Sequence, residues 1–185
     1  MSGINETSDV IVGGTDGTSI GNVADRLKVT SNTNVMEWIN AGKAFSHNVI
    51  HTLSNGQTFY HLIVTPNTTT RIHLKYSIDA TGPLTVELYE APTTSANGTA
   101  ADSYNRDRNS ATATVLLVYH GPTVSADGTL LEAHSIGASG GAKSGSTDSS
   151  DEFILKQNTK YVIKYVSKAS QNDVSDALFW YEVAP

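Results

Sequence analysis

The sequence predicts an all-β protein: an antiparallel, jelly-roll-like β-sandwich that follows an extended N-terminal arm. Three observations predict this class. Short apolar segments have a two-residue period, polar turns separate them at regular intervals, and no segment after residue 33 carries a helical stripe of three turns. A chain of 185 residues is long enough for one domain to bury its own core. We therefore expect a partner-docking arm at residues 1–33 and a β-sandwich domain at residues 34–185.

Nine segments of the sandwich domain have the character of strands. The clearest is Arg71–Ile78, where apolar and polar side chains alternate, so one face should be buried and the other wet. Lys160–Val166 likewise places Tyr161, Ile163 and Tyr165 on one face. The other seven segments are Ala44–Leu53, Gln57–Thr65, Leu84–Tyr89, Thr114–Tyr119, Thr129–Ile136, Glu152–Leu155 and Ala177–Val183.

Two stretches 30 residues apart, Tyr89–Thr99 and Tyr119–Thr129, share the frame Tyr-x-x-Pro-Thr-x-Ser-Ala-[Asn/Asp]-Gly-Thr. Proline has no N–H and therefore ends the pairing of the strand before it. The Asn-Gly or Asp-Gly pair then supplies the positive φ that a tight turn requires. We expect each copy to end a strand and turn the chain.

Composition excludes several classes of function. The chain has no cysteine, so disulfides and thiolate metal sites are absent. A net charge of −6 and a pI near 5.4 argue against a nucleic-acid partner, which requires a basic face. No apolar run approaches the ~20 residues of a membrane span, and the N-terminus lacks the pattern of a signal peptide. We expect the protein to act where it is made or to be carried onward in an assembly.

No catalytic, cofactor-binding or metal-binding residue is predicted. His47 and His51 lie four apart, which on a strand places them on one face, as a metal pair requires. The sequence places no carboxylate or third histidine beside them, so we interpret them as ordinary surface or interface histidines. Asp148, Asp151 and Glu152 offer oxygen ligands for Ca²⁺ without the spacing of a known calcium loop. Nothing pairs two carboxylates across a cleft, so we predict no enzyme.

Thr15–Val29 resembles an N-terminal signature of structural proteins of tailed-phage virions, roughly T-D-G-T-x-I-G-N-V-x-D-R-L-K-V. Residues 88–99, 104–110, 154–162 and 179–182 are similar to the body of the same proteins. Such proteins are described as virion structural, head decoration or head-fibre proteins. The resemblance implies a protein made in the cytoplasm of a bacterial host and located on the capsid surface of the virion.

The resemblance and the predicted arm together lead to a capsid decoration protein, a homotrimer around a local three-fold axis. The first 33 residues cannot bury enough apolar surface to fold alone, so we expect them to dock on the major capsid protein or a neighbouring copy. The predicted contact residues comprise apolar side chains, charged side chains that pair with the partner, and residues of the signature turn. They are Ile11, Val12, Asp16, Gly17, Ile20, Asn22, Val23, Arg26, Leu27, Lys28 and Val29.

An alternative from another class is an appendage of the head or tail that recognises host-surface carbohydrate. Sugar sites on sandwiches use exposed aromatic side chains beside polar groups. The available aromatic residues are Trp38, Tyr60, Tyr104, Trp180 and Tyr181. In alternating strands such residues more often belong to a core or an interface.

Overall fold

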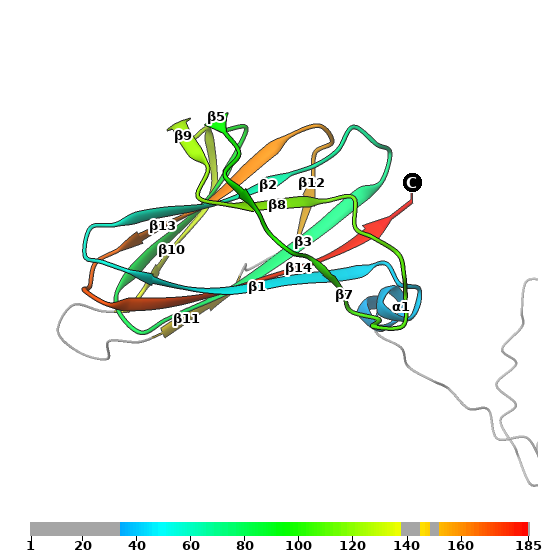
Figure 1. The fold of residues 1–185 in the computed structure, drawn as a ribbon, viewed down its shortest axis with the longest axis horizontal. Helices are drawn as coiled ribbons and strands as arrows, with labels where there is room; N and C mark the ends of the chain where they lie inside the picture. The colour runs from blue at the N-terminus through cyan, green and yellow to red at the C-terminus, as the bar shows by residue number, and fades with distance from the viewer. Residues whose placement is uncertain (1–33, 138–144, 149–151, 185) are drawn as a thin grey trace, which may run out of the picture. The chain divides into compact units, whose positions relative to one another are not determined.

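The computed structural model describes residues 34–137, 145–148 and 152–184. These residues form a sandwich of two antiparallel sheets, with one short helix, α1 (Asn34–Asn40) (Figure 1). The predicted all-β class is therefore confirmed. The predicted arm, residues 1–33, lies outside the described residues.

Two six-stranded sheets form the layers of the sandwich, and a third sheet has two strands. Sheet A has the order β11-β3-β14-β1-β7, with β12 also pairing with β3; its strands are β1 (Ala44–Leu53), β3 (Arg71–Ala80), β7 (Tyr104–Asn105), β11 (Gly145–Asp148), β12 (Phe153–Leu155) and β14 (Asn172–Val183). Sheet B has the order β10-β4-β13-β2-β8-β6; its strands are β2 (Thr58–Val64), β4 (Leu84–Glu90), β6 (Thr99–Ala100), β8 (Leu117–His120), β10 (Thr129–Ile136) and β13 (Lys160–Ser167). The third sheet pairs β5 (Thr93–Ala96) with β9 (Thr123–Ala126).

The order of the strands is jelly-roll-like. The first four long strands alternate between the sheets, β1 and β3 in sheet A and β2 and β4 in sheet B. The last two strands then insert between them, β13 between β2 and β4 and β14 between β1 and β3. Each sheet is therefore closed by pairing between segments far apart in the sequence, as in a jelly roll.

The core lies between the two sheets and follows the predicted alternation. In β3 the apolar positions Ile72, Leu74, Tyr76 and Ile78 are buried, while the polar positions between them are exposed or half-buried. Tyr161, Ile163 and Tyr165 of β13 are buried as predicted. Both sheets contribute to one apolar cluster, which includes Phe45, Leu74, Tyr76, Ile78, Leu178 and Trp180 from sheet A and Ile63, Val86, Leu88, Ile163 and Tyr165 from sheet B.

All nine predicted segments contain strands, with ends that differ by a few residues. The prediction omitted α1 and five short strands, β5, β6, β7, β9 and β11. Strands of two to four residues are too short to show a period in the sequence, and α1 has seven residues, fewer than the three turns sought. Among the described residues no helix is long and apolar enough to cross a membrane.

The two copies of the repeated sequence pack on each other. Their strands β5 and β9 pair antiparallel, with Thr93 opposite Ala126 and Ala96 opposite Thr123. A Cβ on Gly98 of the first copy would lie 2.2 Å from the carbonyl oxygen of His120 in the second. A Cβ on Gly128 of the second copy would lie 2.2 Å from the carbonyl oxygen of Glu90 in the first. This reciprocity is that of a local two-fold axis.

The turn residues of the two copies also have equivalent partners. Asn97 accepts a hydrogen bond from Lys160 at 2.9 Å, and Asp127 accepts one from Lys164 at 2.6 Å. Both lysines belong to β13, four residues apart, so they project from the same face of that strand. The repeat is thus anchored to the central strand of sheet B at two matching points.

Alanine at Gly98 or Gly128 should destabilise the sandwich strongly. Both glycines have positive φ, +89° and +95°, as the Asn-Gly and Asp-Gly pairs predicted, and neither has room for a Cβ. We expect each substitution to lower the free energy of unfolding by roughly 2–4 kcal/mol, measured by urea denaturation. The control is Gly56→Ala, where φ is +75° but no atom lies within 4 Å of the added Cβ, and the cost should stay near about 1 kcal/mol. Equal losses for all three variants would contradict the packing of the two copies.

Candidate functional site

The residues predicted to dock on a partner all lie outside the described part of the chain. They are Ile11, Val12, Asp16, Gly17, Ile20, Asn22, Val23, Arg26, Leu27, Lys28 and Val29. Within the described residues, two features have the chemistry of a site: a cluster of histidines between the sheets, and a groove on the outer face of sheet A.

Strand β1 brings the first two histidines into the interior. Its inward positions are Phe45, His47, Val49, His51 and Leu53, and these are buried or half-buried. The prediction that His47 and His51 share a face is therefore confirmed. The interpretation of His47 as a surface or interface residue is wrong, because His47 is only 4% exposed within a single chain.

Sheet B supplies the other two histidines. His61 of β2 lies directly opposite His120 of β8 in the strand register, and their rings stack with centroids 4.5 Å apart. His61 alternates with Phe59 and Ile63 on the inward side of β2, and it is 0% exposed. Since β1 belongs to the facing sheet, its histidines meet those of β2 and β8 across the interior.

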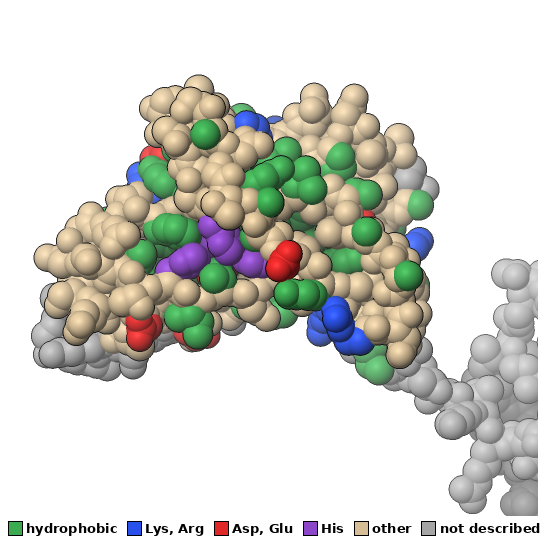
Figure 2. Space-filling model, in the orientation of Figure 1, with side chains coloured by type: hydrophobic (Ala, Val, Ile, Leu, Met, Phe, Trp, Pro, Cys, Tyr) green, Lys and Arg blue, Asp and Glu red, His purple; other side chains and the backbone are tan. Residues whose placement is uncertain are grey.

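The four imidazole rings converge through their Nε2 atoms. The Nε2 atoms of His47 and His120 are 2.9 Å apart, and those of His51 and His61 are 3.2 Å apart. One ligand atom each of His47, His61 and His120 lies within 4.8 Å of the others. Figure 2 shows histidine side chains gathered in a hollow of this face, where solvent can reach them. His51 and His120 are the half-buried members of this histidine cluster.

The opposite ring nitrogens of two members have fixed partners. Nδ1 of His47 lies 2.6 Å from the backbone carbonyl oxygen of Asp102, which can only accept, so this nitrogen carries the proton. Nδ1 of His61 faces the carboxylate of Asp176, which is 0% exposed and also accepts a hydrogen bond from the hydroxyl of Tyr165 at 2.5 Å. Both Nε2 atoms are therefore unprotonated in the neutral rings and direct lone pairs into the cluster.

The surroundings favour the neutral forms of three further groups, two imidazoles and one phenol. Burial and the neighbouring imidazoles of His61, His47 and His51 lower the pKa of His120 to about 4. Burial, followed by His61, also lowers the pKa of His51. Tyr165 is fully buried beside Asp176, and both effects raise its pKa well above the ordinary value, so it remains a hydrogen-bond donor. The lone pairs that neutral imidazoles such as those of His51 and His120 present suit a cation rather than an anion.

His61 and His120 were not predicted to be members of the cluster. Each occupies an inward position of its strand, where an apolar residue is the usual choice, and that was the signal available. Which strands face one another depends on the jelly-roll order, which periodicity does not reveal. The remaining histidines lie elsewhere: His73 bonds to Glu152 at 2.5 Å, and His134 pairs with Glu132 at 2.9 Å.

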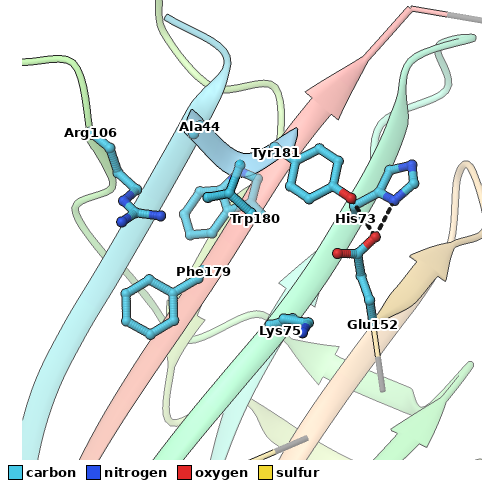
Figure 3. Close-up of a pocket in the computed structure, with 9 residues that line it drawn as sticks. Ala44, His73, Lys75, Arg106, Glu152, Phe179, Trp180 and Tyr181 are labelled. Carbon is cyan, nitrogen blue, oxygen red and sulfur yellow. Dashed lines mark hydrogen bonds and ion pairs between the residues drawn. The ribbon is translucent and has the colours of Figure 1, made fainter. Parts of the chain in front are cut away.

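The groove on sheet A has a volume of about 290 Å³. It is lined by Val35, Ala44, His73, Lys75, Arg106, Glu152, Phe179, Trp180 and Tyr181. Figure 3 shows the Tyr181 hydroxyl and the His73 ring both directed at the carboxylate of Glu152. Burial acts to raise the pKa of Glu152, but the hydrogen bonds from Tyr181 and His73 outweigh it and lower the pKa below its usual value.

The carboxylates considered for calcium do not assemble into a described site. Asp151 and the side chain of Asp148 lie outside the described residues, and Glu152 is engaged by Tyr181 and His73.

The aromatic residues considered for carbohydrate do not form one platform. Trp180 is 2% exposed. Tyr181 stacks on Trp38, with ring centroids 5.7 Å apart, and on His73, at 4.5 Å. Tyr60 bonds through its hydroxyl to Asp127, and the exposed Tyr104 has the guanidinium of Arg108 5.4 Å from its ring centroid.

Comparisons with known proteins give no relative: no family model matches the chain, and no curated protein or solved structure matches it.

Replacing Asp176 by alanine should be strongly destabilising. The change leaves the Nδ1–H of His61 and the hydroxyl of Tyr165 buried without their acceptor, at a cost of roughly 3–5 kcal/mol. Asp173→Ala is the matched control on the same strand, because Asp173 is exposed and bonds only at the surface to Thr52. We expect its cost to stay within about 1 kcal/mol. Urea denaturation of both variants measures the difference, and similar values would remove the structural role assigned to Asp176.

Proposed function

We propose that the chain is a virion structural protein that binds the outer surface of a tailed-phage capsid and stabilises it. The observation that carries the proposal is the resemblance of Thr15–Val29 to the N-terminal signature of such proteins. In this proposal the arm docks on the major capsid protein or on a neighbouring copy, and the sandwich projects from the shell. The assembly is a homotrimer around a local three-fold axis.

The described core of the sandwich lies within the predicted sandwich domain. Every described residue of the apolar cluster lies at Phe45 or later in the chain. The strands of both sheets begin at Ala44, and α1 stacks Trp38 on Tyr181 of sheet A. A chain that begins at residue 30 keeps all of these described elements, so the role of the arm can be tested by deletion.

The mechanism is mass action. A protein that binds the assembled shell but not free capsid subunits stabilises the shell by RT ln(1 + [L]/Kd) at each site. Many copies on one particle act together, so each contact can be weak. Apolar residues such as Ile20, Val23 and Leu27 would supply buried area, while Arg26 and Lys28 would pair with carboxylates of the partner.

Deleting residues 1–29 should abolish capsid binding and leave a folded sandwich. The deletion removes every predicted contact residue but none of the described core. Co-sedimentation with purified capsids measures binding, and circular dichroism checks the fold. A shorter deletion of residues 1–9 is the control, because it keeps all predicted contacts from Ile11 to Val29. Unchanged binding by the longer deletion would refute the role of the arm.

The copy number of the chain in purified virions should be a simple fraction of that of the major capsid protein. A trimer at every three-fold position, where three capsid subunits meet, gives a ratio near one, and a simple fraction such as one third also indicates a protein that covers the shell. Quantitative mass spectrometry of virions measures the ratio. A few copies per particle would instead favour the alternative, an appendage that recognises host-surface carbohydrate, which a glycan array tests directly. Absence from the particle would overturn both.

A further inference from the structure

The histidine cluster has the ligand type and spacing of a transition-metal site. Imidazole nitrogen is a preferred ligand for Zn²⁺, Cu²⁺ and Ni²⁺, whereas Ca²⁺ and Mg²⁺ take oxygen. Tetrahedral Zn–N bonds of about 2.0–2.1 Å place ligand nitrogens about 3.3 Å apart. The Nε2 separations of 2.9 Å for His47–His120 and 3.2 Å for His51–His61 differ from that value by a few tenths of an ångström. One ligand atom each of His47, His61 and His120 lies within 4.8 Å of the other two. Small movements of side chains would therefore suffice to admit an ion.

The contacts on the far side of the rings are those that metal-bound histidines make. A ligating histidine almost always donates its other N–H to a carboxylate or a backbone carbonyl, which fixes the ring and directs its lone pair at the metal. Nδ1 of His61 faces the Asp176 carboxylate, and Nδ1 of His47 faces the Asp102 carbonyl. The rings of His61 and His47 are therefore already oriented by these contacts in the absence of an ion.

The surroundings of Asp176 add a second geometric observation. Its carboxylate is fully buried, and its Oδ1 has no hydrogen-bond partner among the described residues. Its Oδ2 faces Nδ1 of His61 and accepts a hydrogen bond from the hydroxyl of Tyr165. A buried carboxylate is costly without a compensating positive charge. A divalent ion on Nε2 of His61 would supply that charge through the ring.

We propose that the Nε2 atoms of His47, His61 and His120 bind one divalent transition-metal ion of the zinc class. His51 or a water molecule completes the coordination on the side that faces solvent. The ion would connect β1 of sheet A with β2 and β8 of sheet B. All three proposed ligands lie in the sandwich, so this proposal does not depend on capsid binding through the arm.

A network of neutral histidines is the competing explanation of the same geometry. In that network Nε2–H of His120 donates to His47, and Nε2–H of His51 donates to His61, so every ring is satisfied without an ion. The two explanations differ in the protonation of His120. A metal requires Nε2 of His120 to be unprotonated, whereas the network requires it to carry the proton.

Metal titration of the full chain is the first test. The protein should carry no histidine tag and should be stripped with EDTA and dialysed. Isothermal titration with ZnCl₂ at neutral pH is expected to show one ion per chain with a Kd of about 1 µM or lower, and MgCl₂ should give no binding. Zinc at a hundredfold excess over Kd should raise Tm by roughly 5–10 °C. Absence of zinc binding up to about 1 mM would overturn the proposal.

Two histidine variants then locate the ion. His120→Ala removes a half-buried ligand and leaves the His61–Asp176 pair intact, so it should weaken zinc binding at least ~100-fold. His134→Ala is the matched control, since His134 also lies on a strand of sheet B but pairs with Glu132. Its affinity should equal that of the parent chain. Unchanged affinity in His120→Ala, or an equal loss in His134→Ala, would overturn the proposal by placing the ion elsewhere.

Nitrogen NMR of the unaltered chain keeps the proposal falsifiable if His120→Ala does not fold. Long-range ¹H–¹⁵N spectra report which ring nitrogen carries the proton. Zinc should remove the proton from Nε2 of His120 and shift the Nε2 resonances of His47 and His61, while His73 and His134 remain unchanged. Retention of the proton on Nε2 of His120 under saturating zinc would establish the hydrogen-bonded network and exclude the metal site.

Discussion

The buried carboxylate of Asp176 is the constraint on which the interior of the sandwich depends. Asp176 lies on β14 of sheet A, and its carboxylate contacts His61 on β2 and accepts a hydrogen bond from Tyr165 on β13 of sheet B. Apolar contacts between the sheets are not directional, but a buried carboxylate must meet its donors. The contacts among these three side chains therefore fix the position of one sheet relative to the other. The same contact turns Nε2 of His61 toward the other histidines, so the cluster inherits its geometry from this link.

The repeated sequence also helps to position the histidine cluster, through its contact with His120. Gly98 of the first copy lies so close to the carbonyl of His120 that no side chain fits between them, and Thr99 pairs with His120 in the sheet. The backbone of β8 is thus held at its end by the partner copy. The first copy of the repeated sequence therefore positions the imidazole ring of His120.

The sequence allowed the strands and their buried faces to be predicted, because alternation in segments such as Arg71–Ile78 follows directly from burial on one side. It also predicted that His47 and His51 share a face. It did not predict that His61 and His120 join them. That meeting depends on β8 pairing with β2 and on sheet B facing β1, and both depend on interactions across long stretches of sequence. The pairing of the repeats was missed for the same reason: each copy predicts a turn, but only the fold brings two turns together.

An ion in the histidine cluster would link strands of the two sheets, in a chain that has no cysteine and so cannot form a disulfide. His47, His61 and His120 are separated by 14 and 59 positions in the sequence and lie on three strands from both sheets. Because the site forms only in the folded chain, the ion would stabilise the folded sandwich by mass action rather than by restraining the unfolded chain. Unlike a disulfide, the link would depend on free metal and on neutral imidazoles, so the stability of the sandwich would follow the metal content of its surroundings.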